Sequence, residues 1–149
     1  MQVARFFMVR VDFYVLPENS SRERFVCGLV SKAMQGGHRV YIYTPDQHVA
    51  ESLDEMLWTF HDISFVPHEL TSNATSADCP VLIGAGEKLP SGCNVMINLS
   101  GSIPSTVDQC ARVVEIVAGD ENMRNHARDR YRDYRAREFE LHSHTIDRV

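Results

Sequence analysis

Residues Val9–Leu16, Val-Arg-Val-Asp-Phe-Tyr-Val-Leu, decide the fold class. β-branched and aromatic side chains fill this stretch, which is typical of a β-strand, and Pro17 ends it. Four later segments are also predicted as strands: Arg39–Tyr43, Pro80–Gly84, Val95–Leu99 and Arg112–Val117. Helical patterns separate the first strands, so the chain alternates between the two kinds of element.

The helical patterns carry their own start and stop signals. Ser20, with Glu23 three residues later, predicts a capping box, and Gly36-Gly37 predicts the end of that helix. A second helix is predicted from Thr44-Pro45-Asp46-Gln47, with Thr44 as the cap. Because strand, helix, strand and helix follow in close succession, the sequence predicts a parallel sheet covered on both faces.

The second half of the chain continues the α/β pattern. Residues 71–79 are predicted as a polar surface loop, 104–111 as a short helix and 120–137 as a long charged helix. No internal repeat or low-complexity tract interrupts them. We therefore predict one three-layer (α/β/α) domain over residues 1–149, with a mainly parallel sheet.

Composition narrows the class of protein. The 149 residues are 44% hydrophobic and 23% charged, with a formal net charge of −5. A chain of this length buries about 70% of its unfolded surface, so it needs neither disulfides nor a structural metal to fold. No segment approaches the ~20 apolar residues of a membrane span, and we expect no signal peptide. The acidic total argues against bulk non-specific DNA binding.

Cysteines and histidines give no metal signature. No C-x-x-C pair occurs among the four cysteines, which are Cys27, Cys79, Cys93 and Cys110. We predict buried thiols, as expected in a reducing cytoplasm. His142 and His144 form an H-x-H pair without a third ligand at useful spacing, which favours an ordinary surface strand.

Enzyme motifs are absent or incomplete. Gly84-Ala85-Gly86-Glu87-Lys88-Leu89 imitates G-x-G-x-x-G, but Leu89 replaces the third glycine and no P-loop spacing surrounds Lys88. The first strand runs into Pro17-Glu18-Asn19-Ser20, with no glycine to cradle a phosphate. We therefore expect no nucleotide-binding glycine loop, catalytic site, cofactor or metal. The alternative is a small nucleotide-binding or hydrolytic α/β enzyme that uses the carboxyl edge of its strands.

The charged helix is a candidate recognition surface. Residues 124–149 carry seven Arg against five acidic residues, a balance of +2, so residues 1–123 carry −7. One helical face combines arginines with a tyrosine: Arg124, Arg128, Tyr131, Arg132 and Arg135. Arginine favours bidentate contacts with carboxylate or phosphate. A solvated helix balanced by Asp129 and Asp133 explains the pattern equally well.

A second candidate surface combines Leu57-Trp58 with Ser64-Phe65-Val66-Pro67-His68. These aromatic and apolar residues could close the core or form an exposed patch for a partner. Pattern alone favours the core.

These segments, taken together, resemble the chi subunit of the bacterial DNA polymerase III holoenzyme. Leu53-Asp54-Glu55-x-Leu57-Trp58, then residues 64–68, then Ala127-Arg128-x-Arg130-Tyr131-x-x-Tyr134-Arg135 occur in the order found in that family. Val11-Asp12-Phe13-Tyr14 fits the family's opening strand, so the resemblance covers about residues 9–142.

The resemblance implies a non-catalytic module in the bacterial cytoplasm, with a Rossmann-like three-layer fold that lacks a nucleotide site. Chi subunits pair one-to-one with the psi subunit, which ties them to the clamp loader, and they hold the acidic C-terminal tail of single-stranded DNA-binding protein. Contact with DNA would be mostly indirect, no membrane would be involved, and a helicase could compete for the psi-facing surface. The psi-facing residues would be Trp58, Phe65, Val66 and Pro67.

The implied tail site is Val117, Arg124, Arg128, Tyr131 and Arg132. In this site Arg128 would bind the terminal carboxylate, while Arg124 and Arg132 would bind acidic side chains. Val117 and the Tyr131 ring would form a notch for a terminal phenylalanine.

Direct binding of single-stranded DNA to the arginine face is a third possibility. The acidic remainder of the chain and the lack of several stacking aromatics count against it.

The chain departs from the family pattern at its ends. Residues 1–8 extend beyond the usual start, which makes Met8 a candidate initiator, and residues 143–149 are expected to form a flexible tail. Glu138 stands where the family usually has the glycine that ends the final helix, so this C-cap is expected to be frayed or reshaped.

Overall fold

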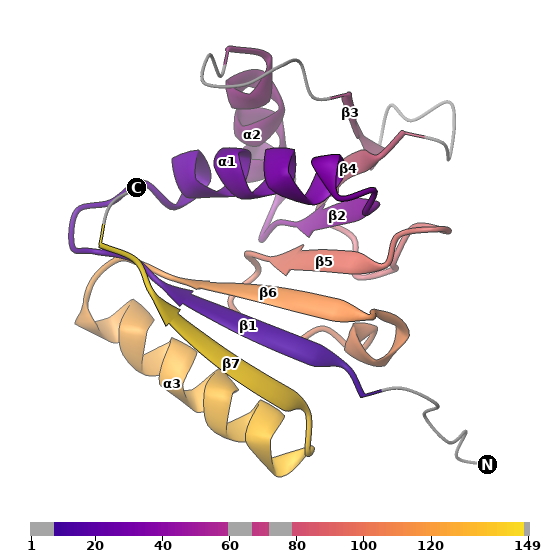
Figure 1. The fold of residues 1–149 in the computed structure, drawn as a ribbon. Coiled ribbons are helices and arrows are strands. Elements are labelled where there is room, and N and C mark those ends of the chain that lie inside the picture. Colours follow the sequence, from indigo (N-terminus) through magenta and orange to yellow (C-terminus); the bar gives the residue numbers. More distant parts are fainter. Residues whose placement is uncertain (1–7, 60–66, 72–78, 148–149) are drawn as a thin grey trace.

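The computed structural model describes residues 8–59, 67–71 and 79–147. These residues form a seven-stranded sheet in the order β3-β4-β2-β5-β6-β1-β7 (Figure 1). The strands are β1 (Arg10–Val15), β2 (Val40–Tyr43), β3 (His68–Leu70), β4 (Val81–Gly84), β5 (Val95–Asn98), β6 (Arg112–Val117) and β7 (Glu140–Thr145). Each neighbouring pair runs parallel, which confirms the predicted parallel sheet.

Helices cover both faces of the sheet. They are α1 (Arg22–Gln35), α2 (Gln47–Thr59) and α3 (Glu121–Ala136). One apolar cluster joins α1 and α2 to the sheet through Val30 and Leu53, and a second cluster joins α3 to the opposite face through Ala127 and Tyr134. Figure 1 shows α3 alongside β1 and β7, apart from α1 and α2. The predicted three-layer Rossmann-like architecture is confirmed.

The first helix begins one residue later than predicted. Its N-cap is Ser21, whose Oγ accepts a hydrogen bond from the Arg24 N–H at 3.1 Å. Ser20 instead belongs to the preceding turn, where its N–H donates to the Pro17 carbonyl at 3.3 Å. The predicted capping box is therefore wrong, because the residue three positions after Ser21 is Arg24.

The start of α2 also differs from the prediction. Asp46 accepts the Val49 N–H through its side chain at 2.9 Å, so Asp46 rather than Thr44 performs the capping. Thr44 is fully buried, and its Oγ1 lies 3.0 Å from the Gly84 carbonyl on the neighbouring strand. The threonine therefore ties β2 to β4 instead of starting the helix.

Two segments in the second half of the chain form different elements from those expected. Only Val107–Gln109 is helical within residues 104–111, as a single 3₁₀ turn (η2), because Cys110 is already extended. Residues 143–145 of the expected flexible tail lie in β7, where they pair with β1. That pairing holds them in the sheet.

Glu138 completes a regular helix C-cap, so the helix end is not frayed. Its φ is +62°, in the left-handed region that glycine prefers. The Glu138 N–H donates to the Arg135 carbonyl at 3.0 Å, and the Phe139 N–H donates to the Tyr134 carbonyl at 3.2 Å. These two bonds are those of a Schellman motif, which a non-glycine residue here adopts at a cost of about 1–2 kcal/mol.

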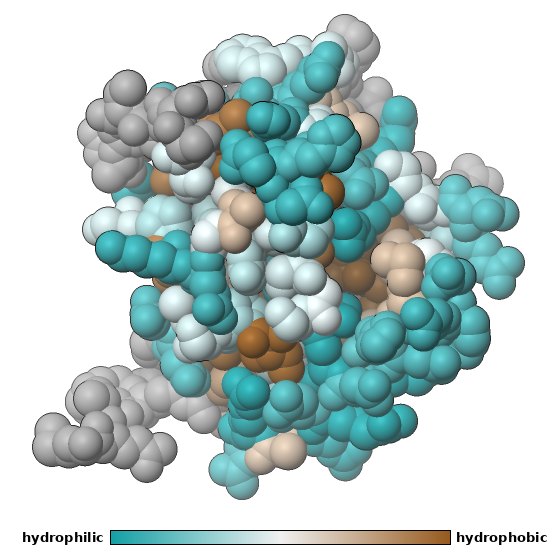
Figure 2. Space-filling view, turned by 180° about the vertical axis from the view of Figure 1, so that it is seen from behind, coloured by the Kyte–Doolittle hydropathy of each residue, from teal (hydrophilic) through white to brown (hydrophobic). Residues whose placement is uncertain are grey.

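The face of the molecule opposite to that of Figure 1 is predominantly polar. Figure 2, which views the molecule from behind, shows a face dominated by hydrophilic residues, with apolar residues confined to small patches. Among the described residues, no helix has the length and apolar character needed to cross a membrane.

Candidate functional site

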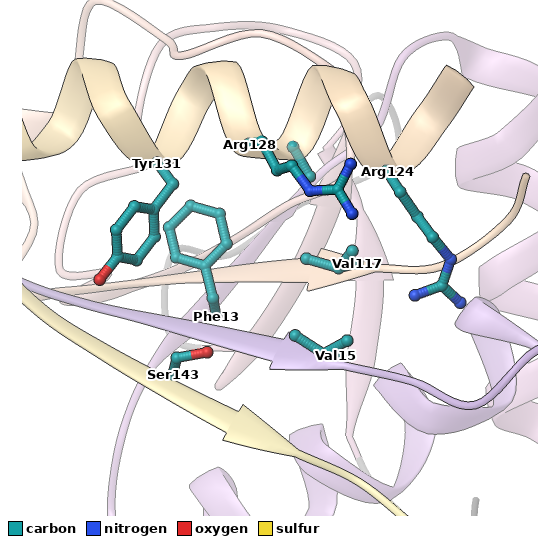
Figure 3. Close-up of a pocket in the computed structure, with 8 residues that line it drawn as sticks. Phe13, Val15, Val117, Arg124, Arg128, Tyr131 and Ser143 are labelled. Atoms are coloured by element: carbon teal, nitrogen blue, oxygen red, sulfur yellow. The ribbon is translucent and has the colours of Figure 1, made fainter. Parts of the chain in front are cut away.

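A pocket of about 300 Å³ opens between α3 and the strands β1, β6 and β7. Its lining residues are Phe13, Val15, Val117, Arg124, Ala127, Arg128, Tyr131 and Ser143. Figure 3 shows the strand residues Phe13, Val15 and Val117 pointing toward α3. This pocket therefore lies beside the helix for which the sequence predicted a recognition surface.

Strand register builds the pocket floor. Phe13 and Val15 are two residues apart, so both side chains project from the same face of β1. Val15 is paired with Val117 on β6, and Phe13 is paired with Ser143 on β7. Three strands thus contribute neighbouring side chains to a floor that is apolar apart from Ser143.

Helical spacing builds the opposite wall. Arg124, Ala127, Arg128 and Tyr131 stand at i, i+3, i+4 and i+7, which places them on one face of α3. The Tyr131 ring meets the Phe13 ring edge to face, with centroids 5.2 Å apart. Ala127 is buried and contributes only a methyl group, which leaves space between the longer side chains.

The two arginines of this wall are oriented by hydrogen bonds. Arg124 donates from Nη2 to the Leu16 carbonyl at 3.0 Å and from Nε to the Gly119 carbonyl at 3.1 Å. Both of these acceptors are uncharged carbonyl groups, so they do not neutralise the positive charge of Arg124. The arrangement combines an apolar floor with cations at the rim. This combination suits a ligand that carries both an apolar group and carboxylates.

Arg128 has acidic and amide neighbours on its own helix. Its Nη1 donates to Asn125 Oδ1 at 2.6 Å and to Glu121 Oε1 at 3.3 Å. The Arg128 side chain is 59% exposed, and that of Glu121 is 75% exposed, so this ion pair is weak and accessible to a competing carboxylate.

A buried polar network holds α3 on the sheet. Glu115 of β6 is 1% exposed and accepts hydrogen bonds from Tyr134 and Asn98 at 2.7 Å, and from Arg130 Nε at 3.1 Å. Burial raises the pKa of the Glu115 carboxyl against the opposing effect of these partners. Arg130 is therefore a structural residue that fixes the helix carrying the pocket, and not a member of the exposed arginine face.

Four of the five residues assigned to the tail site lie together in this pocket: Val117, Arg124, Arg128 and Tyr131. The fifth, Arg132, does not line the pocket and forms an exposed pair with Asp129 at 3.0 Å. Arg132 follows Arg124 by eight positions, which turns its side chain about 80° away from that of Arg124 around the helix axis.

Sequence reasoning missed the strand side of the pocket. Phe13, Val15 and Ser143 were not assigned to the site, although the alternation of Phe13 and Val15 along a strand places them on one face. A strand buried on both faces gives no indication of which face meets which helix.

The second candidate surface is partly described. Trp58 is 58% exposed near the end of α2, and Pro67 is exposed as well. The prediction from pattern alone that Trp58 closes the core is therefore wrong. Phe65 and Val66 lie outside the described residues.

The four cysteines are unbonded. Cys27, Cys93 and Cys110 are buried, as predicted, whereas Cys79 is only half-buried. Burial raises the pKa of Cys27 to about 11 and that of Cys110 to about 12, which keeps both thiols protonated and unreactive.

The two histidines of β7 contact carboxylates. His142 lies 2.6 Å from Glu140, and His144 lies 2.8 Å from the buried Asp12. In the part of the chain that the structure describes, no group of three or more His, Cys, Asp or Glu side chains is placed to hold a metal ion.

Comparisons with known proteins agree on one family. A family model described as DNA polymerase III chi subunit, HolC, matches residues 8–142. The DNA polymerase III subunit chi of Pseudomonas aeruginosa is 36% identical over 144 residues, which cover 95% of this chain and 100% of that protein. Its counterpart in Escherichia coli K12 is 31% identical, covering 93% of this chain and 99% of that protein.

A solved structure supports the fold. The T4 UvsW structure aligns with a TM-score of 0.64 at 9% identity, over 94% of this chain and 41% of that one. At this identity the similarity concerns the fold alone.

Proposed function

We propose that this chain, which belongs to the family of DNA polymerase III chi subunits, is a non-catalytic adaptor of the replication machinery. Family membership makes it an accessory subunit in DNA replication. The finer proposal is that it joins the clamp loader, through psi, to the acidic C-terminal tail of single-stranded DNA-binding protein in the bacterial cytoplasm.

The observation that carries the proposal is the chemistry of the pocket beside α3. Its floor of Phe13, Val15 and Val117 offers an apolar surface to an aromatic side chain. Arg124 and Arg128 stand at the rim, where they can pair with carboxylates. A peptide that ends in acidic residues and a phenylalanine needs both features at once.

Each group of the pocket has a part in holding such a tail. Arg128, the more exposed arginine, binds the terminal carboxylate, which displaces Glu121 from its guanidinium. Arg124, already fixed by two carbonyl groups, presents its remaining N–H donors to an acidic side chain. The terminal phenyl ring packs between Val117 and Tyr131.

The adaptor works through repeated weak contacts. Many tails are present where single-stranded DNA is coated, so one chi subunit that releases a tail meets another at high effective concentration. Because the arginines are solvent-accessible, salt screens their attraction for carboxylates, and the affinity falls as ionic strength rises.

The psi contact is proposed for the opposite end of the sheet. Trp58 and Pro67 are exposed there, close to the edge strand β3. Because α3 lies beside the other edge strand, β7, the chain can hold both partners at the same time. This separation is what a bridging subunit requires.

The turn that connects β1 to α1 is consistent with a binding module rather than with a nucleotide-binding enzyme. In this turn the Ser20 N–H donates to the Pro17 carbonyl, and the Arg24 N–H donates to the Ser21 side chain. These amides already have acceptors, so the first helix N-terminus offers fewer donors to a phosphate.

Fluorescence anisotropy with a labelled acidic peptide ending in phenylalanine tests the tail site. Arg128→Ala should weaken binding at least tenfold, the loss expected for a charge-assisted contact of about 1.5–3 kcal/mol. Arg137→Ala is the matched control, because Arg137 caps the C-terminal end of the same helix, pairs with Asp133 and does not line the pocket. Equal affinity in the parent and Arg128→Ala would refute the site.

A further inference from the structure

Trp58 rests on a buried histidine. Trp58 is the one tryptophan of the sequence and lies near the carboxyl end of α2. Its ring centroid lies 4.6 Å from that of His68, with the ring planes at 54°. His68 is 5% exposed and begins the edge strand β3, so one side of an exposed indole is supported by a residue fixed in the sheet.

His68 is itself held by the helix that carries Trp58. Its Nε2 lies 3.1 Å from the Asp54 carbonyl oxygen and 3.3 Å from Asp54 Oδ1. A carbonyl can only accept, so Nε2 carries the hydrogen and donates it. Asp54 precedes Trp58 by four residues, one helical turn. The imidazole therefore joins β3 to the turn of α2 from which the indole projects.

The surroundings of Trp58 set it apart as an anchor. Its neighbours on the outer side of α2, Glu55 and Thr59, are exposed and polar. Exposed tryptophans are rare, and at interfaces they often contribute much of the binding energy. An anchor held in position before binding loses less side-chain freedom when the partner arrives.

We infer that His68 is a positioning residue, which holds Trp58 in the orientation that docks to psi. This inference rests on the proposed function, in which psi covers the Trp58 surface. Psi would supply an apolar recess for the indole, while His68, buried behind it, would touch psi little. His68 would therefore influence psi affinity only through Trp58.

A double-mutant cycle tests this dependence. Psi affinity is measured by calorimetry for the parent, Trp58→Ala, His68→Gln and the double variant. His68→Gln removes the ring that supports the indole and keeps a side-chain amide that can donate to the Asp54 carbonyl. We expect about a threefold to tenfold loss from His68→Gln when Trp58 is present, and no further loss when Trp58 is already alanine.

Fluorescence provides a second readout, because Trp58 is the sole tryptophan. His68→Gln should lower the steady-state anisotropy of the indole and increase its quenching by acrylamide. His48→Gln is the matched control, since His48 lies on the same helix and is exposed. Unchanged anisotropy and quenching in His68→Gln would overturn the positioning role.

The outcomes separate the inference from the proposed function. If Trp58→Ala leaves psi affinity unchanged, the psi surface is wrong, and the proposed function fails in that part. If Trp58→Ala weakens psi but His68→Gln weakens it equally in both backgrounds, the psi surface stands and the positioning role is overturned. Should His68→Gln not fold, Asp54→Ala replaces it, because it removes one of the two contacts that fix the imidazole.

Discussion

The rings of Phe13 and Tyr131 meet edge to face, with their centroids 5.2 Å apart and their planes at 65°. Phe13 is 3% exposed on β1, whereas Tyr131 is half-buried on α3. A buried ring in the sheet therefore packs against the more accessible ring that walls the pocket. Such a pair contributes about 0.5–1.5 kcal/mol beyond its buried area.

Tyr131 should act in tail binding through its ring and not through its hydroxyl group. Tyr131→Ala is expected to weaken binding of the acidic peptide about tenfold or more, because both the notch and the contact with Phe13 are lost. Tyr131→Phe should stay within about twofold of the parent. Peptide anisotropy titrations check both values. A comparable loss in the two variants would assign the role to the hydroxyl.

Glu121→Gln should strengthen tail binding. Glu121 pairs with Arg128 at 3.3 Å, and a tail carboxylate must displace it. Because both side chains are mostly exposed, the pair is worth about 0.2–1 kcal/mol, which corresponds to a gain of up to about fivefold. Glu51→Gln, an exposed substitution on α2, corrects for the change in net charge. An equal gain in affinity in both variants would contradict a specific role of Glu121, because the change in net charge alone would then explain it.

Glu115→Ala should strongly destabilise the fold. The change leaves Arg130, whose side chain is 14% exposed, and the Tyr134 hydroxyl without their buried acceptor. Removing one partner of a buried pair costs about 3–5 kcal/mol. The free energy of unfolding from urea titrations measures this effect. Asp133→Ala, which breaks the exposed pair with Arg137, should cost less than about 1 kcal/mol after solvent screening. Similar losses would contradict the structural role of Glu115.

Acid should weaken the fold in part through Asp12. Burial alone would raise the pKa of this carboxyl, but hydrogen bonds from Arg10 and His144 and the charge of Arg112 lower it overall. A carboxyl with a lowered folded pKa stabilises the fold above its unfolded pKa of about 4, and this stabilisation is lost as the pH falls through the folded value.

Comparison of Asp12→Asn with the parent isolates this contribution. The parent should be more stable at pH 7, and the difference should shrink as the pH falls below about 4. Urea unfolding at several pH values measures the difference. Asp129→Asn, which alters an exposed carboxyl, serves as the control. A gap between the parent and Asp12→Asn that stays constant with pH would contradict the assignment.

Glu138→Gly should stabilise the protein. Glu138 adopts a φ of +62° at the end of α3, which strains any residue with a Cβ. The glycine relieves this strain, but it also gives the unfolded chain more conformational freedom, which offsets part of the gain. The free energy of unfolding should therefore rise by up to about 1 kcal/mol. Thermal unfolding should show a melting temperature higher by a few degrees. Arg137→Gly, at a φ of −85°, should lower it instead. A lower melting temperature for Glu138→Gly would show that the side chain compensates for its backbone.

Much of the fold could be predicted because its signals are local. The strand at residues 9–16, the glycine pair that ends α1 and the charged helix near residues 120–137 are each specified by residues within a few positions of one another. Two of the errors fell on helix starts, since Ser20 and Ser21, or Thr44 and Asp46, are chemically similar caps. Which of them caps the helix depends on the preceding turn and the neighbouring strand.

The sequence by itself determined that Arg124, Arg128 and Tyr131 share a helix face, because helical periodicity relates residues that are close in the chain. Only the tertiary structure decided what lies opposite them. Strand register brings Phe13, Val117 and Ser143 together across more than a hundred residues, and the sheet is buried on both faces.

Exposure, too, was decided by tertiary packing. Trp58 is exposed and supported by His68, while Arg130 is drawn inward by Glu115. A hydrophobic or charged side chain carries no local signal for these placements. Partners from distant elements decide whether it is covered by the core or left in solvent, and the sequence pattern does not encode those partners.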